Sequence, residues 1–298
     1  MKKVFLGLVW KDEKTPLFHI KTPETNKDEF VMIPQNLDLK NLHERYCVGT
    51  VNLTTMKYLN CNKRVDENTC QCNHCKFLYE FYKCVRCHGE NCKVNNVVSK
   101  DYCDSPHLVY IAYFPNNKLK VGTASVKRKD LRLLEQGAVY GMYIAETPNG
   151  KIARQIENEI MKNGVTGMVS VAYKLKNIRY NEDESQIKSL LYKKYYELLN
   201  LMSYEYKKYM ITPEFKSFPS ILEQQAKCHI LDQNTSMIER EIEQIDGKFL
   251  FAIGKIIAIR TGNAISLIDT RRMDGFVYEF GEQVNYEFLE DGGGELGR

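Results

Sequence analysis

The pattern of apolar and polar positions divides the chain into two β-rich ends and a mixed middle. Short apolar runs of strand length, separated by charged and proline-containing turns, occupy residues 1–46, and similar runs return in residues 246–290. Because the two ends are alike, we expect that they could pack together as one β-rich domain. The predicted strands are 4–10, 17–21 and 30–33 at one end and 249–260, 264–268 and 275–280 at the other.

The segment 105–180 combines strand and helix patterns and predicts a small α/β core. Two apolar runs flank the turn pair Asn116-Asn117, which indicates a β-hairpin. Further along, isoleucines recur at every fourth position, which indicates an amphipathic helix. The expected elements, in order, are strands over 108–114 and 119–122, a helix over 127–135, a strand over 139–145 and a helix that carries Ile152, Ile156 and Ile160.

A helical extension is expected over residues 181–245. One helix is predicted over 183–210 and a second over 221–245, with Pro213 among the residues that separate them. The tail 291–298 contains three consecutive glycines and is predicted to be mobile. The predicted fold class is therefore α+β.

Cysteine is the most informative residue type. The chain has 10 cysteines, and most of them lie in the segment 47–104, which we interpret as a zinc module. Thiols stay reduced in the cytosol, and no export signal is recognisable, so a dense cluster is typical of metal binding. A disulfide framework and an iron–sulfur cluster remain the alternatives, although none of the ferredoxin-type spacings occurs.

The spacing of the cysteines predicts how they share metal ions. Cys72 and Cys75 form one Cys-x-x-Cys pair and Cys84 and Cys87 form another, and each pair can place two thiolates on one ion. We expect about two structural Zn²⁺ ions. One site is expected to use Cys84, Cys87, Cys92 and Cys103, and the other to use Cys61, Cys72 and Cys75 with either Cys70 or Cys47, with His107 as a reserve ligand.

Two tripeptides on the predicted hairpin, Leu108-Val109-Tyr110 and Lys120-Val121-Gly122, resemble the two motifs of the GIY-YIG domain. The order of strands and helices also resembles that family. The string Arg-Leu-Leu-Glu-Gln-Gly-Ala at 132–138, with the cysteine run before it, resembles a prokaryotic family of unknown function that has a zinc-rich segment before a GIY-YIG-like core. This wider resemblance covers residues 40–170.

The resemblance implies a metal-dependent endonuclease that cleaves phosphodiesters of RNA or DNA. Glu157 would hold a catalytic Mg²⁺ or Mn²⁺, and Arg132 would stabilise charge on the phosphate. Tyr110, or His107 near it, would activate water. Lys120 stands where the family has a second tyrosine, and it could contact the phosphate instead.

A protein of another class fits the same residues. It is a non-catalytic, zinc-dependent RNA- or DNA-binding protein, associated with tRNA, ribosomes or another nucleoprotein, that keeps the scaffold as a docking surface. Lys120 in the place of the tyrosine favours this alternative. Convergence of Tyr110, His107, Arg132 and Glu157 on one exposed cleft would support catalysis, whereas burial of Glu157 would rule it out.

Positive charge gathers around the implied site. The net charge is only +4, so an anionic partner must be bound by a local patch. No apolar segment reaches the length of a membrane span, and we expect a cytoplasmic protein without membrane contact; the sequence indicates no particular protein partner. Salt-sensitive binding of nucleic acid is expected at Lys118, Lys127, Arg128 and Lys129, next to Lys120 and Arg132.

Overall fold

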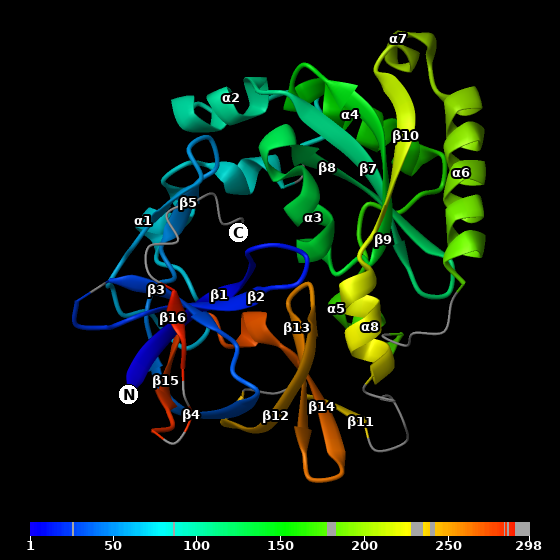
Figure 1. Ribbon diagram of the computed structural model, residues 1–298. Coiled ribbons are helices and arrows are strands. Elements are labelled where there is room, and N and C mark those ends of the chain that lie inside the picture. Colours follow the sequence, from blue (N-terminus) through cyan, green and yellow to red (C-terminus); the bar gives the residue numbers. More distant parts are fainter. Residues whose placement is uncertain are drawn as a thin grey trace. The chain divides into compact units, whose positions relative to one another are not determined.

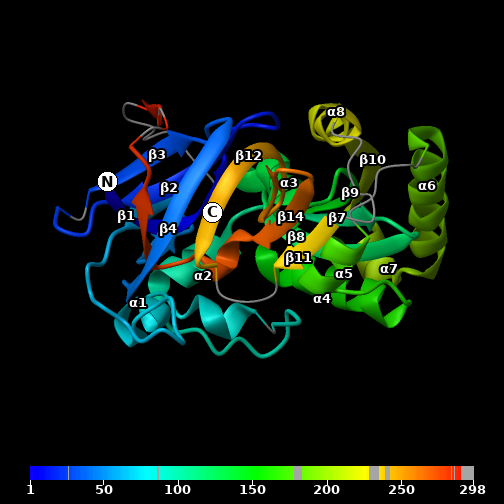
Figure 2. The same cartoon turned by 90° about the horizontal axis from the view of Figure 1, so that it is seen from below.

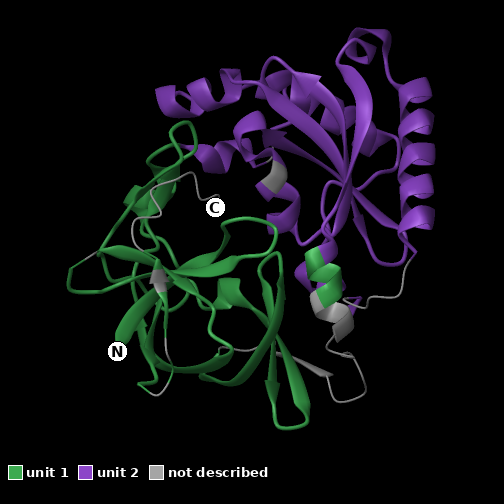
Figure 3. Cartoon of the chain, in the orientation of Figure 1, with its two compact units in different colours: residues 1–79, 220–298 green, residues 80–219 purple. Residues whose placement is uncertain are grey.

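The computed structural model divides the chain into two compact units. Unit 1 consists of residues 1–79 and 220–298, and unit 2 is the continuous segment 80–219 between them (Figure 3). The boundary between the units falls inside the cysteine-rich segment, so its cysteines are divided between the two. The structure describes residues 1–25, 27–85, 87–177, 183–227, 235–238, 242–282, 284 and 286–289. The tail 291–298 and Cys228 lie outside these residues.

Unit 1 is built on a ten-stranded sheet with the order β11-β14-β13-β12-β4-β15-β1-β2-β3-β16 (Figure 1). Strands from both ends of the chain interleave in this sheet: β4 lies between β12 and β15, and β15 also pairs with β1 (Figure 2). The strands are β1 (Lys2–Trp10), β2 (Pro16–Lys21), β3 (Asp28–Met32), β4 (Asn36–Arg45), β11 (Thr235–Ile238), β12 (Gln244–Ile253), β13 (Ile256–Thr261), β14 (Ala264–Asp269), β15 (Phe276–Phe280) and β16 (Phe288–Leu289).

The core of unit 1 lies along β1 and β2. Nearly every side chain of both strands is buried, which explains why their sequences are apolar runs rather than alternating patterns. The Trp10 indole N–H donates to the carbonyl of Gly254 at 3.0 Å, so the largest side chain of this core also has its polar atom satisfied. The smaller elements of unit 1 are β5 (Thr50–Asn52), β6 (Lys57–Leu59), α1 (Asn73–Phe77), α8 (Pro219–Lys227, which starts at the unit boundary) and the 3₁₀ turn η3 (Thr270–Arg272).

Unit 2 contains a four-stranded antiparallel sheet with the order β10-β9-β7-β8. Helix α3 connects β8 to β9, α4 follows β9, and α6 runs along the side of the sheet that ends in β10 (Figures 1 and 2). The strands are β7 (His107–Phe114), β8 (Lys118–Ser125), β9 (Tyr140–Thr147) and β10 (Met210–Ser217). The helices are η1 (Phe81–Cys84), α2 (Val97–Asp104), η2 (Val126–Arg128), α3 (Lys129–Gln136), α4 (Gly150–Lys162), α5 (Val171–Lys176), α6 (Glu184–Leu201) and α7 (Tyr204–Lys207).

Local sequence signals explain the middle of unit 2. Asn116 and Asn117 both have positive φ angles, 61° and 57°, which a tight two-residue hairpin turn requires. Helix α4 begins after Asn149, whose side chain accepts a hydrogen bond from the N–H of Ile152 at 2.9 Å. Its buried side includes Ile156 and Ile160, as the spacing of the isoleucines predicts.

Two predicted helices are too long. The helix predicted over 221–245 is α8, which ends at Lys227, and the described residues beyond it include β11 and the start of β12. The helix predicted over 183–210 ends at Leu201, and the chain continues through α7 into β10. In both cases pairing with a strand far away in the sequence decides the structure, because β12 pairs with β4 and β10 pairs with β9.

Candidate functional site

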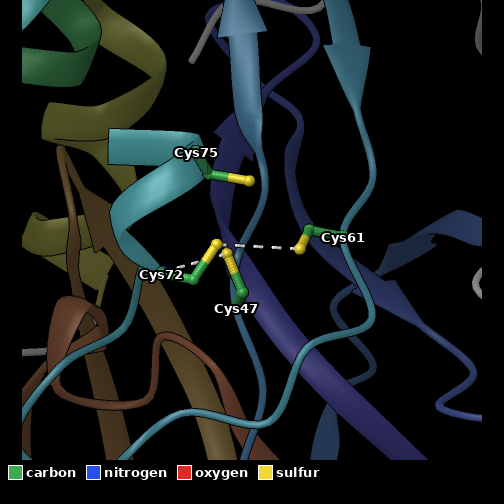
Figure 4. Close-up of side chains that lie close together, drawn as sticks. All are labelled: Cys47, Cys61, Cys72 and Cys75. Carbon is green, nitrogen blue, oxygen red and sulfur yellow. Dashed lines mark hydrogen bonds between the residues drawn. The ribbon is translucent and has the colours of Figure 1, made fainter. Parts of the chain in front are cut away.

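Four cysteines of unit 1 gather around one point, and we call them the four-cysteine cluster: Cys47, Cys61, Cys72 and Cys75 (Figure 4). Their sulfur atoms all lie within 4.8 Å of one another. The Sγ atoms of Cys61 and Cys72 are 3.9 Å apart, close to the edge of about 3.8 Å that follows from a tetrahedron with Zn–S bonds of about 2.3 Å. The fourth member is Cys47, one of the two residues that the spacing left open.

Three separate segments position these sulfur atoms. Cys47 follows β4, Cys61 follows β6, and Cys72 and Cys75 lie at the start of α1 and within it. The backbone N–H groups of Gly49 and Cys72 each donate to Cys47 Sγ at 3.3 Å. Such N–H donors stabilise a thiolate and hold its orientation.

The thiols of this cluster are unequal in acidity. Burial opposes ionisation of Cys72, but hydrogen bonds from the N–H of Cys75 and from neighbouring thiols outweigh it and lower the pKa of Cys72 to about 7. Burial raises the pKa values of Cys75 and Cys47. A divalent cation would complete this arrangement by displacing the remaining protons. The four-cysteine cluster can therefore hold a metal ion, and its all-sulfur ligand set suits zinc.

Unit 2 holds the other predicted set of cysteines, Cys84, Cys87, Cys92 and Cys103. Burial raises the pKa of Cys84 to about 11, and the charges of the other three thiols add to this rise, so the four lie near one another. Their sulfur atoms are not gathered within 4.8 Å, in contrast to the four-cysteine cluster, which is the one such group found among the described residues. No disulfide joins the described cysteines.

Three backbone N–H groups make contacts within this second set. The N–H of Cys87 donates to the carbonyl of Cys84 at 3.1 Å, and the N–H of Gly89 donates to Cys87 Sγ at 3.4 Å. The thiol of Cys103 accepts a hydrogen bond from the N–H of Lys151 in the first turn of α4. The N–H of Lys151 partly opposes the rise in the pKa of Cys103 that burial causes.

A second site lies on one face of the unit 2 sheet. Tyr110 on β7 is opposite Gly122 on β8, and Ala112 is opposite Lys120. Because side chains alternate along a strand, Tyr110 and Lys120 project from the same face. The charges of two further residues act on both of them: Arg132 from α3 and Glu157 from α4. The structure therefore gathers four of the five residues predicted to be catalytic.

Tyr110 is fully buried at the base of this site. Its phenol ring covers Gly122 so closely that a Cβ atom there would lie 2.4 Å from the hydroxyl oxygen. Among the described residues this hydroxyl makes no hydrogen bond of good geometry, although the guanidinium group of Arg132 lies close enough for a weak one. Burial raises the pKa of Tyr110, and the nearby charge of Arg132 only partly opposes this, so the hydroxyl is neutral at pH 7.

Glu157 is buried, with 8% of its surface exposed. Its Oε2 accepts a hydrogen bond from Nη1 of Arg154 at 2.8 Å. Arg132 pairs less closely with Glu135, whose Oε2 lies 3.3 Å from Nη1 of Arg132. The side chains of Arg132 and Arg154 are 32% and 33% exposed, so both are partly accessible to solvent.

Lys120 has an unusual protonation equilibrium. Burial, together with the positive charges of Arg132 and Lys174, lowers the pKa of Lys120 from 10.5 to about 7. Its Nζ donates to Oε1 of Gln136. We call Tyr110, Lys120, Arg132, Arg154 and Glu157 the charged cluster.

His107 has a structural environment. It is 4% exposed, its Nδ1 lies 2.8 Å from the carbonyl oxygen of Ser105, and its ring packs edge-on against Tyr102. A Cβ atom on Gly150 would lie 3.2 Å from the imidazole, so α4 closes the other side. Burial lowers the pKa of His107 and keeps the ring neutral.

Of the four cations predicted to bind nucleic acid, two are exposed and two form ion pairs with carboxylates. Lys118 and Lys127 are exposed. Arg128 is 8% exposed and donates to both carboxylate oxygens of Glu135. Lys129 pairs with Glu214 on β10. The buried ion pair gives Arg128 a role inside unit 2 rather than on its surface.

The sequence interpretation missed Arg154 and Glu135. Arg154 stands three positions before Glu157, and on a helix this spacing brings two side chains together. This spacing of three residues could have identified Arg154 as the partner of Glu157 from the sequence. No set of carboxylates and histidines with metal-ligand geometry surrounds Glu157 in the described part of the chain.

Comparison with known families places the chain in one of them. A family described as "Protein of unknown function (DUF2797)" matches residues 34–276. The chain belongs to this family. The DUF2797 match includes all of unit 2, both sets of cysteines and the charged cluster. No curated protein and no solved structure matches the chain.

No helix in the described part of the chain combines the length and the apolar character that a membrane span needs.

Proposed function

We propose that this protein binds the phosphodiester backbone of RNA or DNA at the charged cluster and is a zinc-containing nucleic-acid-binding protein. The observation that carries the proposal is the excess of cations over carboxylates at this site. Lys120, Arg128, Arg132 and Arg154 lie near two carboxylates, those of Glu157 and Glu135, and the side chains of Arg132 and Arg154 are 32% and 33% exposed. A phosphate bound here would also favour the charged form of Lys120, which burial disfavours in its absence.

The arrangement of unit 2 supports a GIY-YIG-type scaffold. The strand order β8-β7-β9, with α3 between β8 and β9 and α4 after β9, agrees with the order expected from the two tripeptides. Exposed Lys118 and Lys127 would extend the phosphate contacts from the hairpin and the following turn.

Pairing of Glu157 favours a binding protein over a nuclease. A divalent cation can use this carboxylate only if Arg154 releases it, and no group of three or more metal-ligating side chains gathers around Glu157 among the described residues. The second candidate, a Mg²⁺- or Mn²⁺-dependent endonuclease, is favoured by the gathering of Tyr110, Arg132 and Glu157.

The metal of the four-cysteine cluster is proposed to be Zn²⁺, and Cys84, Cys87, Cys92 and Cys103 are proposed to hold a second Zn²⁺. Metal analysis of purified protein should find about two zinc ions per chain. Cys47→Ser and Cys84→Ser should each remove about one. Iron, or well-folded protein without metal, would contradict this part of the proposal.

Binding experiments test the proposal directly. Labelled single-stranded, duplex and structured RNA and DNA are titrated with wild type, Arg132→Ala and Arg154→Ala at several salt concentrations. Each variant should bind at least about tenfold more weakly, as loss of a charge-assisted phosphate contact predicts. Lys193→Ala, an exposed cation of α6, is the control and should bind like wild type. Equal binding by all four proteins would contradict the proposal.

Cleavage experiments separate the two candidates. The same nucleic acids are incubated with wild type and Glu157→Gln, with and without Mg²⁺ or Mn²⁺. Cleavage by wild type that disappears in Glu157→Gln would establish the endonuclease. Binding without cleavage by either protein is the result expected here.

A further inference from the structure

Two arginines of unit 2 share one buried carboxylate. Nη2 of Arg128 donates to both carboxylate oxygens of Glu135 on α3, and its distance to Oε2 is 2.5 Å. The same Oε2 lies 3.3 Å from Nη1 of Arg132. A hydrogen bond between a guanidinium group and a carboxylate is normally about 2.7–2.9 Å long. Arg128 is therefore paired closely with Glu135, and Arg132 only loosely.

The two arginines also differ in their access to solvent. The side chain of Arg128 is 9% exposed and that of Glu135 is 4% exposed, whereas that of Arg132 is 32% exposed. Within these three residues, two guanidinium groups and one carboxylate leave one positive charge over. Because Arg128 holds the carboxylate more closely, this positive charge belongs mainly to Arg132, the accessible member.

The other accessible arginine of the charged cluster is paired one to one. Nη1 of Arg154 lies 2.8 Å from Oε2 of Glu157, within the normal range for a charge-assisted hydrogen bond. Arg132 lies farther from its carboxylate and shares it with a second arginine. Arg132 is therefore the guanidinium group that is better able to bind a phosphate.

We propose that Arg128 is a positioning residue for nucleic-acid binding: it occupies the carboxylate of Glu135 and so keeps the guanidinium group of Arg132 available for a phosphate. The inference rests on the proposed binding of nucleic acid at the charged cluster, and it adds a buried residue that does not itself touch the phosphate. A buried carboxylate without a close partner is unfavourable. If Arg128 were absent, Glu135 would therefore draw Arg132 into a close ion pair and withdraw it from the phosphate.

The test measures the affinity of full-chain variants for labelled RNA and DNA, single-stranded and duplex, at several salt concentrations. Arg128→Gln removes the charge that occupies Glu135, and Arg128→Gln/Glu135→Gln removes both charges of the buried pair. Each change is also made together with Arg132→Ala. Lys3→Gln is the control, since it removes another buried cation, which pairs with Glu29 in unit 1. Urea denaturation gives the folded fraction of each variant, so that every affinity refers to folded protein.

Arg128→Gln should bind about tenfold more weakly than wild type, because the phosphate contact of Arg132 is lost. The slope of affinity against salt concentration should fall by about 1. Arg128→Gln/Glu135→Gln should recover both the affinity and the slope of wild type to within about threefold and about 0.5, because the competing carboxylate is gone. When Arg132 is already alanine, Arg128→Gln should change the affinity by less than about threefold. Lys3→Gln should bind like wild type.

Failure of this inference can be distinguished from failure of the proposed function. Wild type that binds no nucleic acid would remove the binding site and the role of Arg128 together. Wild type that binds, with unchanged affinity in folded Arg128→Gln, would leave the site intact and exclude the positioning role. If Arg128→Gln does not fold, the double variant with Glu135→Gln decides, because it removes both members of the buried pair. Binding by this folded double variant that is about tenfold weaker than that of wild type would exclude the role as well.

Discussion

Arg154 and Glu157 face each other across one turn of α4, with 2.8 Å between Nη1 and Oε2. The side chain of Glu157 is 10% exposed and that of Arg154 is 33% exposed. The carboxylate that the sequence marks as a metal ligand is therefore already neutralised by a neighbouring cation. This pair decides how the charged cluster is to be tested.

Loss of Arg154 should destabilise unit 2. Arg154→Ala leaves the carboxylate of Glu157 buried without its partner, and we expect the free energy of unfolding to fall by about 1–2 kcal/mol, less than for a fully buried pair because the arginine is one-third exposed. The double variant Arg154→Ala/Glu157→Gln should recover most of this loss. Urea denaturation measures both effects, and strictly additive losses would show that the two residues are not coupled.

Replacement of Tyr110 by phenylalanine should show whether the Tyr110 hydroxyl group contributes to stability or to a cleavage reaction. The hydroxyl makes no hydrogen bond of good geometry among the described residues, and Arg132, which interacts with it weakly, also pairs with Glu135, so its removal leaves no group without a partner. We expect Tyr110→Phe to change the free energy of unfolding by less than about 1 kcal/mol, with either sign. A larger destabilisation would mean that the hydroxyl has a structural partner. Loss of a cleavage activity in this stable variant would identify a chemical role.

The stability of the protein should depend on pH through Lys120. Its pKa is lowered from 10.5 to about 7, so between these values the unfolded chain binds a proton that the folded chain does not. Burial of the charged Lys120 side chain destabilises the folded protein. This destabilisation is largest below about pH 7 and disappears as the pH rises toward 10.5.

Lys120→Met removes this effect and leaves the titration of the cysteines in place. The free energy of unfolding of wild type, minus that of Lys120→Met, should rise as the pH is raised from about 7. Urea denaturation at several pH values measures this difference. A flat difference would show that the folded protein keeps Lys120 charged.

Near the hairpin, the exposed lysines should affect only the binding of nucleic acid, whereas the buried Arg128 should also affect stability. Lys118→Gln and Lys127→Gln remove exposed charges, and together they should lower the slope of binding against salt concentration by about 2 without loss of stability. Arg128→Gln breaks a buried ion pair with Glu135 and should lower the free energy of unfolding by about 3 kcal/mol. A salt slope that responds to neither lysine would place the nucleic acid elsewhere.

The local elements of unit 2 were predictable because neighbouring residues determine them. Asn116 and Asn117 adopt the positive φ angles that their hairpin turn needs, and the isoleucines of α4 are spaced for one buried side. Which strands pair in the sheets was harder to predict from the sequence. The sequence pattern predicts that Pro213 separates two helices, yet it lies in β10 at the edge of the sheet, where a missing N–H is tolerated.

The candidate sites were predictable to a similar degree. Spacing alone proposed Cys61, Cys72 and Cys75 together, because two residues between cysteines leave both thiolates on one side of a turn. The choice between Cys47 and Cys70 depends on how β4 leads into the cluster, which spacing does not encode.

The interleaved sheet of unit 1 sets an order of events during synthesis. The amino group of Met1 donates to the carbonyl of Phe280, 279 positions later. Strand β4 pairs with β12 and β15, which are both synthesised much later than β4 itself. Unit 2 leaves the ribosome whole before any of these partners exists. Its own contacts can form first, while the apolar surfaces of β1, β2 and β4 lack their later neighbours. The early strands therefore have to avoid aggregation throughout the time it takes to make unit 2.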